Sequence, residues 1–119
     1  MGHADRKAIS KKITNATTET QIFTAPWRIR RRYFIKKLII SNEQATNVAV
    51  VQFIDKDTAS ATPPVRGATN TAPLLEILAP AKGTITFEEA ELPCEFFGSG
   101  MVAYSDFNNV VVMVEVEED

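Results

Sequence analysis

The sequence predicts an all-β fold: an antiparallel β-sandwich, jelly-roll-like, with about eight short strands. Three observations lead to this prediction. The apolar segments are short and rich in β-branched residues and threonine, their apolar positions recur mostly with a period of two, and turn-forming residues separate them. No window longer than about ten residues keeps the 3.6-residue period of a helix. Many short strands joined by short turns are typical of sandwiches rather than parallel sheets.

The expected strands follow from these patterns in chain order. They lie near residues 9–14, 20–24, 33–41, 47–54, 74–78, 84–89, 101–105 and 110–117. Turns are expected where Asn, Asp, Pro and Gly cluster, at 42–45, 80–83, 98–100 and 106–109. In the last strand, four valines at alternate positions share one face, so this face is expected to be buried. The residues expected in the core are Phe53, Ile85, Phe87, Val112 and Val114.

The chain of 119 residues has the length of one domain. Residues 1–8 are polar and are expected to form a flexible N-terminal arm, and 9–119 a single β-sandwich domain. A long loop is expected at 55–73, where small residues, threonines and prolines dominate. Loops of this length are either functional or disordered, and both alternatives stay open. The N-terminus has no signal-peptide pattern, and the longest apolar run, 110–114, is too short for a membrane helix.

Charge is distributed unevenly along the chain. Residues 1–40 contain ten Lys/Arg and two Asp/Glu, a balance of +8, whereas residues 41–119 contain three and thirteen, a balance of -10, which together give the net -2. If the two regions fold onto opposite surfaces, copies attract one another head to tail or around a ring. If they fold together, they neutralise each other within one subunit.

The densest basic segment is WRIRRRYFIKK at 27–37. One hypothesis is phosphate binding by a row of guanidinium groups. The other, which we favour, is pairing with carboxylates within the subunit or across an interface, because the pI of about 5.4 is low for a nucleic-acid-binding domain. We also expect a turn or bulge near 30–32. The candidate docking residues are Arg28, Arg30, Arg31, Arg32, Lys36, Lys37, Glu115, Glu117 and Glu118.

The sequence contains few of the residues that form enzyme active sites. His3 is the single histidine and Cys94 the single cysteine, which excludes a Ser-His-Asp triad, a disulfide within the chain and a cysteine-based zinc site. Asp55-Lys56-Asp57 lacks the later ligands of a calcium loop. The glutamates between 88 and 95 favour a solvated acidic edge over a cation site. We therefore expect no catalytic residue, no metal and no cofactor.

Three segments resemble a known family. A strand ending in Ile40-Ser41-Asn42, a turn from Pro80 to Thr84 before the Ile85–Phe87 strand, and the glycine-flanked strand followed by the valine-rich terminal strand are similar to small β-sandwich virion proteins of tailed phages, of the head-decoration or auxiliary capsid type. The resemblance covers about two thirds of the chain. The basic WRIRRR stretch is not part of that pattern.

The resemblance implies a non-enzymatic structural protein, present in many copies on a symmetric shell and often self-associated. Its expected partners are the major capsid protein or another virion protein, together with further copies of itself. The expected location is the virion, after synthesis in the host cytoplasm, with no membrane contact. The runner-up is a nucleic-acid-binding accessory protein that uses the basic 28–37 cluster, and a carbohydrate-binding sandwich comes third because the sequence has one Trp and two Tyr.

Overall fold

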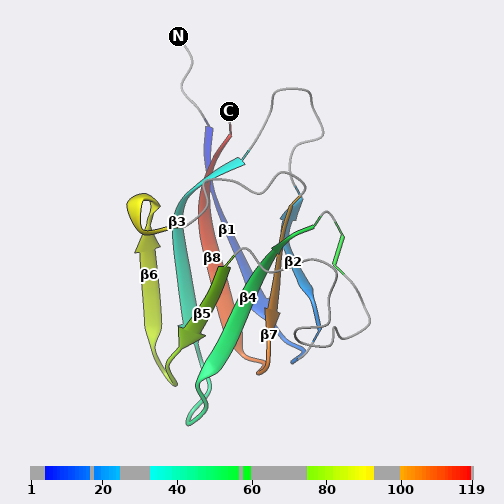
Figure 1. The fold of residues 1–119 in the computed structure, drawn as a ribbon, viewed down its shortest axis with the longest axis vertical. Helices are drawn as coiled ribbons and strands as arrows, with labels where there is room; N and C mark the ends of the chain where they lie inside the picture. Colours follow the sequence, from blue (N-terminus) through cyan, green and yellow to red (C-terminus); the bar gives the residue numbers. More distant parts are fainter. Residues whose placement is uncertain are drawn as a thin grey trace.

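The structure, a computed structural model, describes residues 5–16, 18–24, 33–56, 58–59, 75–92 and 100–118. For Asp5, Tyr33 and Glu118 it describes the backbone. The described residues form eight strands and one short 3-10 helix (Figure 1). In chain order these are β1 (Asp5–Ile13), β2 (Thr20–Thr24), β3 (Tyr33–Asn42), β4 (Ala49–Asp55), β5 (Leu75–Ala79), β6 (Thr84–Glu88), η1 (Glu89–Glu91), β7 (Gly100–Ser105) and β8 (Val110–Glu118). The predicted all-β sandwich is confirmed.

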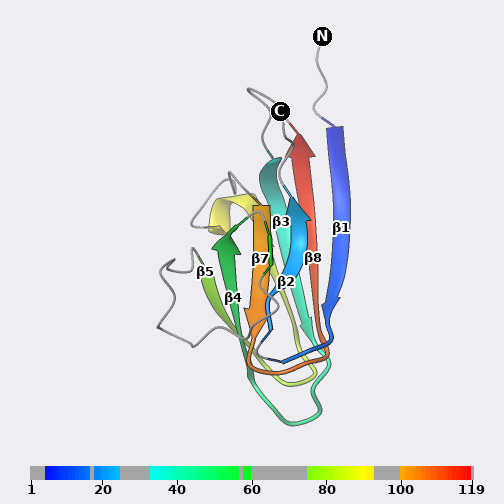
Figure 2. The same cartoon turned by 90° about the vertical axis from the view of Figure 1, so that its right-hand side faces the viewer.

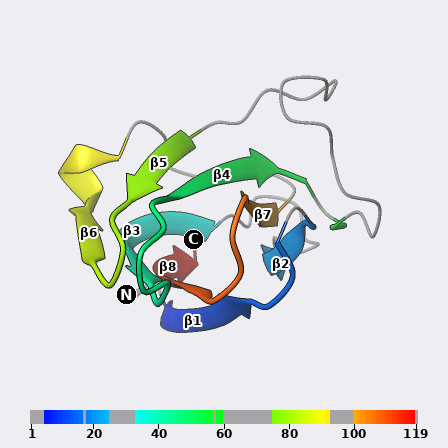
Figure 3. The ribbon, with the colours of Figure 1, turned by 90° about the horizontal axis from the view of Figure 1, so that it is seen from below.

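The strands form two four-stranded sheets, with the orders β1-β8-β3-β6 and β2-β7-β4-β5. They lie one above the other when the molecule is viewed along its long axis (Figure 3). Strand β1 pairs with β8, β2 with β7, β3 with β6 and β4 with β5, all antiparallel. The chain is thus a set of nested hairpins, from β4–β5 inside to β1–β8 outside, rolled into two layers. This is the strand order of an eight-stranded jelly roll.

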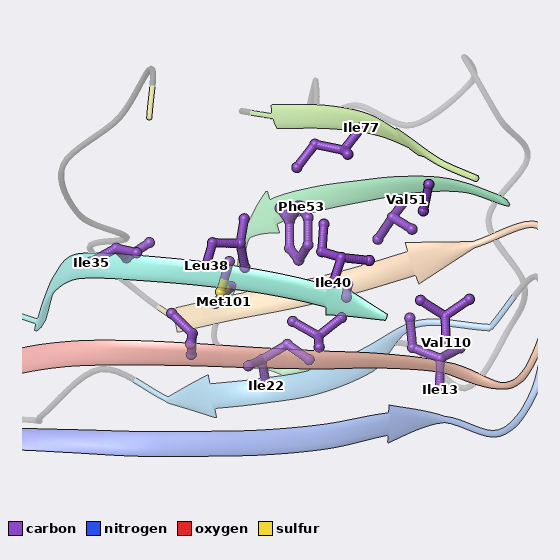
Figure 4. Close-up of a cluster of buried hydrophobic side chains, with 14 of the residues drawn as sticks. Ile13, Ile22, Ile35, Leu38, Ile40, Val51, Phe53, Ile77, Met101 and Val110 are labelled. Carbon is purple, nitrogen blue, oxygen red and sulfur yellow. The ribbon is translucent and has the colours of Figure 1, made fainter. Parts of the chain in front are cut away.

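The core fills the space between the two sheets (Figure 4). Alternate residues of β8 point inward, so Val110, Val112, Val114 and Val116 are fully buried, as the pattern predicts. From the facing sheet Phe53 and Met101 are also fully buried. Burying such side chains contributes roughly 1.5–3 kcal/mol each. The interior of the sandwich is therefore an apolar core.

Two of the five expected core residues lie at its margin. Ile85 and Phe87 pack against the core but are only partly buried. They belong to β6, which has one neighbour, β3, among the described strands, so one side of each residue is left uncovered. The alternation gave the correct face of the strand but overestimated its depth.

The expected flexible arm at 1–8 requires a correction. Strand β1 begins at Asp5, and residues 5–8 pair with β8 from Glu118 to Glu115. This pairing could not be predicted from the local sequence, because the strand begins with charged residues. Their partners lie at the other end of the chain. Residues 1–4 lie outside the described residues, as do 60–73 of the expected long loop.

The structure places a bulge in β3 between Ile35 and Lys37, whereas the irregularity expected near 30–32 lies outside the described residues. Ile35 and Leu38 are both buried although they are three residues apart. Strict alternation would place them on opposite faces, and the extra residue, Lys36, returns Leu38 to the core side. Of the helices that the structure describes, none is long and apolar enough to cross a membrane.

Candidate docking surface

The predicted basic and acidic segments meet at one end of the β1-β8-β3-β6 sheet. Strands β3 and β8 are neighbours, and Lys37 lies opposite Glu115, Phe34 opposite Glu117 and Tyr33 opposite Glu118. The start of β3 and the end of β8 therefore lie at the same end of the molecule, beside the start of β1 (Figures 1 and 2). Arg28, Arg30, Arg31 and Arg32 lie outside the described residues, but the chain they belong to enters β3 at Tyr33, opposite the acidic C-terminal segment.

Arg6 of β1 binds Glu115 and Glu117, the two glutamates of β8 whose side chains the structure describes. Its Nε lies 3.1 Å from Oε2 of Glu117, its direct partner across the strands, and its Nη1 lies 3.2 Å from Oε1 of Glu115, the diagonal partner. The hydrogen bond with Glu117 is the largest cause that raises the pKa of Arg6 above its usual value. Of the predicted docking glutamates, Glu115 and Glu117 thus already have a cation of their own subunit, and Arg6 was missed because it fell within the expected arm.

The two predicted docking lysines also have acidic partners in the same chain. The Lys36 Nζ lies 3.1 Å from Oε1 and 3.2 Å from Oε2 of Glu89, and the Lys37 Nζ lies 3.6 Å from Oε1 of Glu88. The bulge makes this possible, because it sets two consecutive lysines beside the end of β6 and the start of η1. The backbone N–H of Glu88 donates to Oε1 of Glu91 at 2.9 Å, which closes the turn into η1. The acidic edge is exposed at Glu88, Glu89 and Glu91, as expected, and two of these glutamates also pair with lysines.

Together these residues form a row of alternating charge across the sheet. It runs from Arg6 on β1, through Glu115 and Glu117 on β8 and Lys37 on β3, to Glu88 on β6. We call these five residues the charge ladder. Opposite charges on neighbouring strands attract each other and like charges repel, so the ladder favours this strand order. Its members are partly exposed, and exposed ion pairs contribute little to stability because water and salt screen them. Its main consequence is the pattern of charge on the surface.

A second, more buried group fixes the start of the long loop. Lys56, directly after β4, places its Nζ 2.7 Å from Oε1 of Glu19, whose side chain is 4% exposed. Gln21 donates to the carbonyls of Phe23 and Lys56, at 2.8 and 3.3 Å, and accepts from the N–H of Ala59 at 2.7 Å. These bonds attach the first described residues of the loop to β2.

Gly100 lets the backbones approach each other at the same place. A Cβ at Gly100, where φ is +157°, would lie 2.7 Å from the Lys56 carbonyl oxygen and 2.8 Å from that of Phe23. A side chain at this position would force the two neighbouring strands apart. The role of Gly100 is therefore structural, and the Gly98 and Ser99 positions before it lie outside the described residues.

The outer face of the other sheet carries exposed apolar residues that the sequence interpretation did not select. Leu78 on β5 is 64% exposed and Val48, just before β4, is 53% exposed. Val50, half-buried, lies opposite Leu78 in the strand pairing. The alternation in 74–78 was the available signal, since Leu78 falls on the face opposite Ile77. Large exposed apolar residues that lie close together are typical of contact surfaces.

The described residues contain no group of three or more His, Cys, Asp or Glu side chains that could hold a metal ion. Asp55 of the weak calcium-loop pattern accepts a hydrogen bond from the N–H of Gly100 at 3.3 Å. Asp57, Glu95 and Cys94 lie outside the described residues.

No family model matches this sequence, and no curated protein sequence matches it significantly. Among solved structures, the chain is similar to the coat protein of Tobacco streak virus, with 13% sequence identity and a TM-score of 0.37 over 94% of this chain and 85% of that chain. The jelly-roll assignment rests on the strand order rather than on this likeness.

Proposed function

We propose that this protein is a non-enzymatic structural component of a virion, which docks on or stabilises a phage capsid as a decoration or cement protein. The observation that carries the proposal is the nested pairing of eight strands, from β4–β5 inside to β1–β8 outside. This jelly-roll architecture is shared by viral capsid proteins, lectins and cupins. Because one fold hosts several functions, the choice among them has to come from the surface and the interior.

The interior favours a structural role. The space between the sheets is filled by aliphatic and aromatic side chains such as Leu38, Val51 and Phe53, each fully buried. Small-molecule sites, by contrast, are concave pockets in which a few polar groups converge on the ligand. The distinctive features of this chain are on its surface: the charge ladder, the exposed Leu78 and Val48, and the basic segment before β3. Surfaces of this kind are used to bind other proteins.

The particle contact is assigned to the arginines at 28, 30, 31 and 32. The lysines that follow them face Glu88 and Glu89 of their own chain. The partners are the major capsid protein or another virion protein, and further copies of this chain. The protein is made in the host cytoplasm and resides in the virion.

The experiment is to purify the particles of the source by density gradient, count copies of this chain by quantitative mass spectrometry and locate it by cryo-electron microscopy. We expect many copies at symmetry-related positions on the shell. The proposal would be overturned if the chain were absent from the purified particles. It would also be overturned if the particles held less than one copy of the chain for each repeating group of shell subunits. Purified protein retained on DNA with a steep salt dependence would instead identify a nucleic-acid-binding accessory protein.

A further inference from the structure

The β1-β8-β3-β6 sheet has two edges of opposite charge. Strand β1 has one neighbour among the described strands, β8, and β6 has one, β3. Residues 5–13 contain one Asp, one Arg and three Lys, a balance of +3, and residues 84–91 contain three Glu and no Lys or Arg, a balance of -3. Lys7 and Lys11 on β1, and Glu89 and Glu91 after β6, are exposed. Arg6, Lys12, Glu88 and Glu89 have ion-pair partners in their own chain, but their side chains stay exposed and the two edge segments carry opposite charge.

The strand directions also match. All three pairs in this sheet are antiparallel, so β1 and β3 run one way and β8 and β6 the other. If a second copy continues the sheet in the same orientation, its β6 runs antiparallel to β1 of the first copy. Both edges could then form a regular antiparallel ladder of hydrogen bonds.

The level of the residues along the sheet brings the opposite charges together. The pairing aligns Glu88 with Lys37, Lys37 with Glu115, and Glu115 with Ala8. If a second copy lies at the same height along the strands, Glu88 on β6 of that copy lies beside Ala8 on β1 of the first copy. One step further, the antiparallel register brings Glu89 opposite Lys7, and η1, which begins at Glu89, ends the ladder there.

The residue beside Glu88 is the uncharged Ala8, but the alternation of charge from strand to strand continues across this contact. Within one copy, the sign alternates from positive on β1, to negative on β8, positive on β3 and negative on β6. The next strand would be β1 of another copy, which is positive. By contrast, β1 against β1 would oppose lysines, and β6 against β6 would oppose glutamates. Like charges on an edge strand are a device that prevents such pairing.

We infer that copies of this protein associate side by side, with the basic β1 edge of one copy against the acidic β6–η1 edge of the next. The contact uses two different surfaces, so it is head-to-tail and forms a ring if the rotation between copies closes and an extended row if it does not. This inference concerns the isolated chain and does not depend on the proposed virion role.

The test is a charge exchange between the two edges, measured by sedimentation of the isolated chain over a range of concentrations at low salt. The K7E/K11E variant makes both edges acidic, and the E89K/E91K variant makes both edges basic. Each variant alone is expected to need at least about tenfold higher concentration than the wild type to associate, because like charges then face each other. An equimolar mixture should associate again, since each contact then joins opposite charges.

Circular dichroism and thermal melting check that both variants fold. Glu76→Lys on the exposed face of β5 is the matched control, because it alters net charge in the same direction as E89K/E91K but lies in the other sheet. A wild type that stays monomeric at all concentrations overturns the inference. It is also overturned if either variant alone associates like the wild type, or if the mixture stays monomeric.

Discussion

The side chain of Asn42, a buried polar residue, joins three segments of the chain by hydrogen bonds. Its Nδ2 donates to the carbonyls of Asn47 and Ala79, at 2.8 and 3.0 Å, and its Oδ1 accepts from the N–H of Gln44 at 2.9 Å. The sequence predicted a turn here, because Asn side chains often bond the backbone two residues on. The bond to Ala79 at the end of β5 could not be predicted, since it joins the two sheets across 37 positions of sequence.

Replacement of Asn42 by Ala is expected to lower the free energy of unfolding by about 2–4 kcal/mol, because three hydrogen bonds are lost and the buried Ala79 carbonyl keeps no side-chain donor. Urea denaturation measures the change. Asn108→Ala is the control: Asn108 is exposed, and surface changes usually stay within about 0.5 kcal/mol. Equal effects of the two substitutions would show that the buried bonds of Asn42 contribute little.

At the scale of the element, periodicity predicted the strands well and their depth less well. All eight strands were predicted, and the 20–24 strand has the same bounds in the structure, because apolar alternation and turn residues are local signals. Features that depend on distant partners were missed. The start of β1 at Asp5 depends on the acidic end of β8, and the bulge at Lys36 depends on the register with the same strand.

Strands β4 and β6 give a direct comparison of depth. Phe53→Ala is expected to cost about 3–5 kcal/mol, because Phe53 is fully buried between the sheets. Phe87→Ala on the edge strand β6 is expected to cost less than half of that, because this side chain is only partly buried and water already reaches it. Thermal or urea unfolding of both variants gives the difference. A cost at Phe87 as large as at Phe53 would mean that another chain or segment covers the β6 edge.

At the scale of the whole molecule, the charge split along the sequence is partly neutralised by the fold. The sequence left open whether the basic and acidic regions face opposite directions or fold together. In the described residues, Arg6, Lys36 and Lys37 all pair with glutamates of the 41–119 region. This outcome followed from the pairing of β1 with β8 and of β3 with β6, which local sequence patterns do not specify. The sequence therefore predicted which charged residues belong to the candidate site, but not which of them pair with one another.

The pairing also determines how the acidic C-terminal segment has to be tested. Removal of residues 117–119 would take away backbone partners of both β1 and β3, since Glu117 lies opposite Arg6 and Phe34. A loss of assembly in such a truncated chain would then reflect a damaged sheet as much as a lost contact. Substitutions that keep the backbone and remove the charge separate the two effects.

Charge reversal of Arg30 and Arg32 to Glu is expected to abolish binding to the particle while the far-UV circular dichroism stays that of the wild type. The reason is that the carboxylates proposed to receive these arginines would then meet like charges, which costs both orientation and affinity. Lys82→Glu, in the exposed turn between β5 and β6, is the control for net charge and should bind normally. Glu117→Gln with Glu118→Gln should weaken binding if neighbouring copies supply the carboxylates, and leave it unchanged if the shell protein does. If the charge-reversed protein still binds particles but loses a salt-sensitive affinity for DNA, the role of these arginines is nucleic-acid binding instead.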